Sequence, residues 1–145
     1  MKVQDSIEIA AAPEKIWPFL VKPELIIKWY TLLQRFEYTS RQRSGAGTTF
    51  YMEEKGGVLM KLNFTVTEWT ENRALGFRMT SGNFVTAYEQ RWTLTPSATD
   101  TTFTCAEDVT MPYGALGRVL GAVARSTSKA HMREMLVKLK ALAEA

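Results

Sequence analysis

The sequence has very few of the residues that form disulfides or bind metals. Among its 145 residues there is one cysteine, Cys105, and one histidine, His131. A single cysteine cannot form an internal disulfide, and zinc sites usually combine several Cys and His side chains. We therefore expect no metal site and a fold that is stabilised by its apolar core, which a chain of this length is large enough to build.

Long apolar segments and clusters of like charge are also missing. No stretch of about 18 apolar residues is present, and the first residues lack the apolar segment of a signal peptide. The 18 basic and 15 acidic residues give a formal net charge of +3 without a basic cluster that would bind nucleic acid. These features predict a cytoplasmic protein with no nucleic-acid partner and no stable membrane insertion.

Alternating apolar and polar residues occupy most of the chain. This period of two residues is typical of strands with one buried face, and glycine, proline and polar turns separate the segments. The Gly56-Gly57 pair predicts a tight hairpin, because both central residues of such a turn have positive φ. Seven strands are predicted, at Val3–Ala10, Gln34–Arg41, Thr48–Glu54, Val58–Thr70, Leu75–Met79, Phe84–Thr95 and Thr101–Val109.

Two short helices are predicted between the first and second strands. Pro13 and Pro23 each suit a helix start, where the missing N–H group removes no hydrogen bond. Pro18 should limit the first helix to a turn or two. The second helix should run from Glu24 to Trp29 or Tyr30.

One long helix is predicted after Pro112, because no turn signal recurs and apolar residues follow at helical spacing. These residues are Leu116, Val119, Leu120, Val123, Met132, Met135, Leu136, Leu139 and Leu142. The order of elements predicts an α+β fold in which a curved antiparallel sheet of about seven strands grips one long C-terminal helix. No linker or repeat divides the chain, so residues 1–145 should form a single domain.

Several segments resemble those of one large superfamily. They are Ala12-Pro13-Glu14-Lys15-Ile16-Trp17-Pro18-Phe19-Leu20, Gly47-Thr48-Thr49-Phe50, Val66-Thr67-Glu68-Trp69 and the hairpin from Trp92 to Thr104. The chain resembles the START-related (SRPBCC, helix-grip) superfamily, and within it the polyketide cyclase/dehydrase-like branch. Asp100 stands where that hairpin usually has glycine. The resemblance covers nearly the whole chain and implies the helix-grip fold, but this frame hosts binders, carriers and enzymes alike.

A curved sheet around one helix leaves space that side chains must fill, and space left unfilled accepts apolar ligands. The inward-facing residues therefore either line a ligand cavity or form a packed core, and for any single residue the core is the commoner role. The candidate ligand-binding residues are Tyr38, Phe50, Met60, Leu62, Phe64, Phe77, Met79, Tyr88, Gln90, Trp92, Phe103 and Glu107.

Two residues are candidates for catalysis. Glu107 shares an otherwise apolar strand face with Phe103 and Cys105, and burial would raise its pKa into the range of a general acid or base. Alternatively, Glu107 lies at the mouth of the sheet, solvated or paired with Arg78 or Arg91. His131 lies on the long helix and either faces the cavity or sits at the edge of the apolar stripe.

The sequence leaves three functions open. The first is binding of a small hydrophobic molecule, such as a lipid, polyketide or aromatic metabolite, between the sheet and the C-terminal helix. The second is a cofactor-independent cyclase or dehydratase that uses polar cavity residues, and the third is a protein-interaction module whose cavity is vestigial. We expect no cofactor, and a monomer or homodimer.

Overall fold

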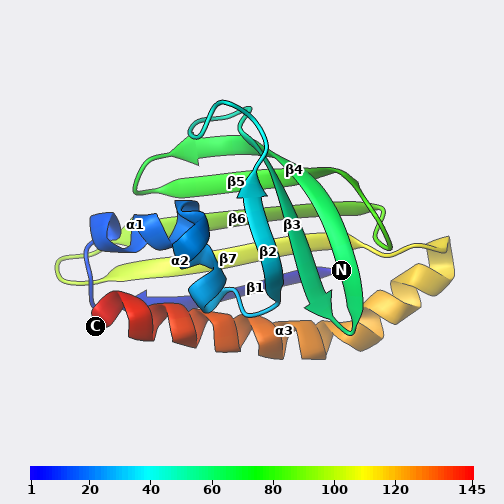
Figure 1. Cartoon of the computed structure of the whole chain (residues 1–145). Coiled ribbons are helices and arrows are strands. Elements are labelled where there is room, and N and C mark those ends of the chain that lie inside the picture. The colour runs from blue at the N-terminus through cyan, green and yellow to red at the C-terminus, as the bar shows by residue number, and fades with distance from the viewer.

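The computed structural model describes residues 1–145 and contains seven strands and three helices (Figure 1). The strands are β1 (Lys2–Ile9), β2 (Leu33–Tyr38), β3 (Thr49–Gly56), β4 (Val58–Thr70), β5 (Ala74–Gly82), β6 (Ala87–Pro96) and β7 (Thr101–Thr110). The helices are α1 (Pro13–Val21), α2 (Pro23–Trp29) and α3 (Gly114–Glu144). The predicted order of elements is confirmed.

All seven strands form one antiparallel sheet in the order β1-β7-β6-β5-β4-β3-β2. Strands β2 to β7 follow one another as hairpins, whereas β1 pairs with β7, the last strand in the chain. The sheet curls into a half-barrel, and α3 runs alongside β1 (Figure 1). The α+β fold predicted from the sequence, a curved sheet that grips a long C-terminal helix, is therefore confirmed.

Helix α1 is longer than its internal proline suggested. It spans nine residues and continues through Pro18 to Val21. Pro18 cannot donate to the carbonyl of Glu14, and its ring displaces that carbonyl, but Glu14 lies in the exposed first turn, where the carbonyl can turn toward water. The buried Ile16, Trp17 and Leu20 stabilise the helix by packing into the core.

The start of β6 and the glycine hairpin also differ from the prediction. The alternation predicted a strand from Phe84, but β6 begins at Ala87, and Phe84 has a φ of 69° with an exposed side chain. This left-handed conformation belongs to the loop after β5 and cannot continue a strand. In the hairpin between β3 and β4 only Gly57 has a positive φ, whereas Gly56 pairs with Val58 as part of the sheet.

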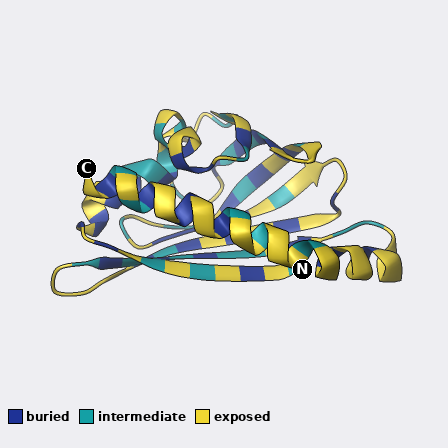
Figure 2. Ribbon diagram, turned by 90° about the horizontal axis from the view of Figure 1, so that it is seen from below, coloured by how far each residue is buried: buried dark blue, intermediate teal, exposed yellow.

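Helix α3 consists of a packed half and an exposed half. Toward the C-terminus, Met132, Met135, Leu136 and Leu139 are buried against the sheet. The earlier half extends past the sheet, and most of its surface is exposed (Figure 2). None of the three helices combines the length and apolar character needed to cross a membrane.

Gly117 in the exposed half of α3 has a steric role. A Cβ atom there would lie 1.9 Å from the main-chain oxygen of Pro112. Only glycine lets the segment that enters α3 fold this closely against the helix.

Basic side chains on α3 hold the helix to β1. Arg133 forms a 2.9 Å ion pair with Asp5, and Lys140 donates to the carbonyl of Glu8. Arg125 donates to the carbonyl of Lys2 at the end of the same strand. This side of the helix therefore contributes contacts within the chain.

Candidate functional site

A cavity of about 190 Å³ lies between one end of the sheet and the middle of α3. The ends of β3 and β7, the loop before β6 and the α3 residues from Ala124 to Met135 form its wall. Of the seventeen residues that line it, eleven are apolar. The polar members include Glu54, Glu107, Ser128 and His131, so the cavity combines an apolar wall with a small set of polar groups.

Behind the cavity wall lies a buried network centred on Gln90. The Gln90 Nε2 atom donates to the hydroxyl oxygens of Tyr30 at 2.7 Å and Tyr88 at 2.9 Å. Gln90 Oε1 accepts from the Trp92 indole at 2.8 Å and from the Cys105 thiol at 3.7 Å. Both N–H donors and both lone pairs of the amide oxygen therefore have partners, so the polar side chain of Gln90 can be almost fully buried.

Two carboxyl groups terminate this network on the cavity side. Tyr30 donates to Glu54 Oε1 at 3.1 Å, and Tyr88 donates to Glu107 Oε2 at 3.4 Å. The two hydroxyl oxygens are 3.2 Å apart and both accept from Gln90 Nε2, so the network is continuous from one carboxyl to the other. Glu54 is 2% exposed, and its Oε2 atom has no hydrogen-bond partner within the protein.

The pKa values of both carboxyl groups are raised toward neutral pH. Burial raises the pKa of Glu54 to about 8, and the nearby charge of Glu107 adds to the effect, while the neighbouring hydroxyl groups of Tyr88 and Tyr30 oppose it. Burial also raises the pKa of Glu107 to about 7, against the opposing hydrogen bond from Tyr88 and the positive charge at Met1. Such values are suited to proton transfer near pH 7.

Glu54 was not among the residues singled out from the sequence. It follows Phe50 and Met52 at intervals of two on β3, and both of these are buried. The same parity places Glu54 on the inner face. The alternation along the strand therefore predicts that Glu54 faces inward. The adjacent Glu53 and Lys55, however, are typical of the polar end of a strand.

The structure brings four of the sequence candidates together around the cavity. Met60, Tyr88 and Glu107 line its sheet side, and His131 lines its helix side. Gln90 lies one layer deeper and positions Tyr88. Glu107 is half-buried and does not pair with Arg91, which instead forms an ion pair with Glu68.

The other apolar candidates do not line this cavity and belong to the packed core or its edge. The ring of Phe77 packs against Phe50 and Trp92, with ring centroids 5.2 and 5.1 Å apart. The free space left in this region is only about 10 Å³, roughly the volume that one water occupies. The candidates outside the cavity wall are Tyr38, Phe50, Leu62, Phe64, Phe77, Met79, Trp92 and Phe103.

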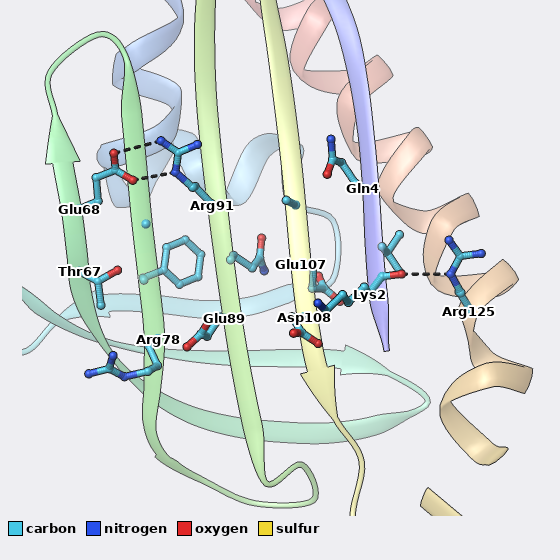
Figure 3. A pocket seen from close by; sticks show the side chains of 15 residues that line it. Lys2, Gln4, Thr67, Glu68, Arg78, Glu89, Arg91, Glu107, Asp108 and Arg125 are labelled. Carbon is cyan, nitrogen blue, oxygen red and sulfur yellow. Dashed lines mark hydrogen bonds and ion pairs between the residues drawn. The ribbon is translucent and has the colours of Figure 1, made fainter. Parts of the chain in front are cut away.

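A larger hollow, of about 530 Å³, lies on the opposite, outer face of the sheet (Figure 3). Gly76 and Ala106 lie in its floor, and charged side chains of both signs line it. Arg91 and Glu68 form a two-point ion pair across β4 and β6, at 2.8 and 3.1 Å (Figure 3). Because this hollow is more open and has few apolar residues, the largely apolar cavity near α3 is the better candidate site.

No site for a metal ion is evident in the arrangement of side chains. His, Cys, Asp and Glu residues do not gather anywhere in groups of three or more with the geometry of metal ligands. Cys105 is buried, and its thiol pKa is raised, chiefly by burial. It therefore has the properties of an inert core thiol.

The sequence and the fold together identify the family. Residues 1–144 match the family model described as polyketide cyclase/dehydrase and lipid transport, so the chain belongs to this family. An uncharacterised protein of Mycobacterium tuberculosis is 26% identical over 111 residues, which span 75% of this chain and 66% of that relative. The chain thus covers slightly less than two thirds of the length of its curated relative.

Solved structures show the same fold. A START superfamily protein of Mycobacterium smegmatis superposes with a TM-score of 0.77 at 18% identity, over 97% of this chain and 98% of the other. The Zhui aromatase/cyclase of Streptomyces sp. R1128 has a TM-score of 0.76 at 15% identity, over 99% and 93% of the two chains. At these identities the likeness concerns the fold alone.

Proposed function

We propose that this protein binds a small, largely apolar molecule in the cavity between the sheet and α3. The observation that carries the proposal is the wall of this cavity, in which Met60, Val85 and Met132 surround a polar end formed by Glu54 and Glu107. Ligand sites are typically apolar with a few polar groups that orient the ligand. The family description, which includes lipid transport, supports the same reading.

The size of the cavity suggests the size of its ligand. An engineered apolar cavity of about 150 Å³ is known to hold benzene. The cavity here is about 190 Å³ and lies beside the partly exposed Phe84 and Met111 at its edge. We therefore expect a ligand with one or two rings, or a short chain, in the cavity itself. Methionine side chains in the wall can adjust to its shape.

Native mass spectrometry of the purified protein tests the proposal directly. We expect a stoichiometric adduct of a small apolar molecule, or a bound fluorescent apolar probe when the protein is isolated empty. Ser128→Phe should abolish either signal, because Ser128 lines the cavity and a phenyl ring would occupy it.

Ser126→Phe is the matched control for this experiment. Ser126 is exposed on the same helix and is not part of the cavity wall, so the substitution should leave binding unchanged. Equal binding by both variants, or no binding of any apolar probe to the unmodified protein, would contradict the proposed function.

The paired carboxyls favour a second candidate function, a cofactor-independent cyclase or dehydratase. An ionised Glu107 can take a proton from the carbon beside a ketone, and that carbon then bonds to a second carbonyl carbon. A protonated Glu54 can give its proton to the resulting alkoxide, and loss of water completes the condensation. The two pKa values of about 7 and about 8 match these two roles.

A linear diketone that closes to an enone tests this second function, with the ultraviolet absorbance of the enone as the readout. Glu107→Gln should remove turnover, while Glu89→Gln on the exposed face of β6 should retain it. If turnover is absent, or is equal in wild type and Glu107→Gln, the protein is a binder and not this kind of enzyme.

A further inference from the structure

The hydrogen-bond network fixes which of its groups donate and which accept, and Trp92 sets the direction of these bonds. An indole nitrogen can only donate, so the Gln90 atom 2.8 Å from it must be the amide oxygen. The amide nitrogen of Gln90 therefore points the other way and donates to both Tyr30 and Tyr88. This assignment follows from the chemistry of the groups.

The hydrogens of the two tyrosines are consequently directed at the carboxyl groups. Each hydroxyl oxygen already accepts from Gln90, and each hydroxyl has one hydrogen left to donate. Tyr30 then donates to Glu54 Oε1 and Tyr88 to Glu107 Oε2, so the two hydroxyl oxygens, 3.2 Å apart, are linked through their shared donor Gln90 and exchange no hydrogen with each other. Every donor of the network then has an acceptor.

Two oxygens on the cavity side remain without a partner. Glu54 Oε2 is buried and makes no hydrogen bond. Glu107 accepts only at Oε2, which leaves its Oε1 free. A buried polar atom without a partner costs free energy, so its presence in a cavity wall points to a group that the ligand supplies.

Mutual repulsion of the two carboxyl groups opposes their ionisation together near pH 7. They lie at the two ends of one short buried network, where mutual repulsion favours a single negative charge. Glu54 is the more deeply buried of the two, and burial disfavours the charged form, so Glu54 keeps the proton. Since Oε1 of Glu54 accepts from Tyr30, the proton lies on Oε2 of this cavity-lining residue.

The wall thus presents one donor, Glu54 Oε2–H, and one acceptor, Glu107 Oε1. We propose that the molecule bound here carries a hydroxyl group at its inner end, whose oxygen accepts from Glu54 and whose hydrogen donates to Glu107. A hydrocarbon would leave Glu54 Oε2 unpaired, and a carboxylate would be repelled by the negative charge on Glu107. The inference rests on the proposed binding function and specifies its ligand class, an apolar alcohol or phenol.

Binding of naphthalene, naphthol and naphthoate at pH 7 tests this ligand class, because the three probes share one apolar body. Because naphthol can donate a hydrogen bond to the charged Glu107, it should bind about 10- to 100-fold more tightly than naphthalene. Naphthoate should bind no more tightly than naphthalene. Calorimetry of the full chain, or displacement of a fluorescent probe, measures all three.

Two substitutions of Glu54 provide the matched variants. Glu54→Gln keeps an N–H donor at the same place and should preserve the preference for naphthol. Glu54→Leu removes the donor and should reduce the naphthol preference to within about 3-fold of naphthalene. Circular dichroism checks that each variant is folded, and the comparison of the three probes on the unmodified protein is decisive even if a variant fails to fold.

The outcomes separate this inference from the proposed function. If naphthalene and naphthol bind equally, or naphthoate binds most tightly, the ligand class is wrong while the binding function stands. If none of the probes binds, both are wrong.

Discussion

Glu54 and Glu107 are the two carboxyl groups of the proposed site. Both belong to one network with Tyr30, Tyr88 and Gln90, in which the tyrosine hydroxyls each accept one hydrogen bond and donate another. A change in any member alters the hydrogen positions of the others. Substitutions of single residues in this network should therefore change how the stability of the protein depends on pH.

The stability of the protein should fall with rising pH because of Glu54. An unfolded chain releases the Glu54 proton near pH 4.5, whereas the folded protein holds it up to about pH 8. Folding therefore takes up a proton between these values, and the free energy of unfolding decreases as the pH rises, by up to about 1.4 kcal/mol per pH unit. Glu54→Gln should remove much of this slope and raise stability at pH 8.

Urea denaturation between pH 5 and pH 8 measures this slope. Glu53→Gln, on the opposite face of the same strand, is the control and should keep the slope of the wild type. The titratable groups that face Glu54 or its network are Tyr30, Tyr88, Cys105, Glu107, His131 and the amino group of Met1. An unchanged slope in Glu54→Gln would assign the pH dependence to one of these groups instead.

Gln90 should be essential to stability although it is polar. Gln90→Leu preserves most of the side-chain volume but leaves the Trp92 indole and the Tyr30 and Tyr88 hydroxyls without their partner. Unsatisfied buried groups cost about 1–3 kcal/mol each, so we expect a loss of at least about 2 kcal/mol in urea denaturation. Gln4→Leu, at an exposed position of β1, should change stability by less than about 0.5 kcal/mol.

Strand parity predicted the inward direction of Tyr88, Gln90 and Glu107, but it could not separate the cavity wall from the packed core. Phe77 and Met60 both face inward, yet Phe77 packs between other rings while Met60 borders free space. The difference depends on how far the opposite surface lies across the curved sheet. That distance is a property of the sheet's curvature and is not encoded in the alternation of one strand.

At the scale of elements, α3 is the part most unevenly stabilised. Its C-terminal half buries a methionine- and leucine-rich face, while Leu116, Val119 and Val123 in its first half are exposed. Leu136→Ala should destabilise the protein by about 2–5 kcal/mol because Leu136 is fully buried. The adjacent Val137→Ala, at a 50% exposed position, should cost less than about 1 kcal/mol.

Thermal or urea unfolding of these two variants shows whether packing or helix propensity stabilises the C-terminal half of α3. Alanine has the highest helix propensity, so propensity alone would make both substitutions neutral or stabilising. Equal effects at Leu136 and Val137 would show that the C-terminal half of α3 is not anchored as the structure shows.

Element boundaries were predictable where turn chemistry was strong and less so where local patterns continued into a loop. Gly57 marks the β3–β4 hairpin and Pro23 opens α2, as expected from their backbone preferences. Phe84, in contrast, fits the alternation of β6 by residue type while its backbone is left-handed. A side-chain pattern reports burial preference and contains little information on φ.

At the scale of the whole molecule, a bound ligand should stabilise the fold. Naphthol at 100 times its dissociation constant adds about 2.7 kcal/mol to the free energy of unfolding. For a chain of this length that corresponds to a rise in Tm of roughly 5–10 °C. Differential scanning fluorimetry should show this rise in wild type and Ser126→Phe and none in Ser128→Phe.

The pairing of β1 with β7 has a consequence for biosynthesis. Residues of β1 emerge from the ribosome before their partners, Thr101 to Asp108, which follow roughly 100 residues later. At about 5–20 residues per second, β1 therefore waits for about 5–20 s without its neighbour. During that interval the apolar Val3 and Ile9 of the nascent chain are uncovered, and we expect chaperones that bind short extended segments to hold β1 until translation passes Thr110.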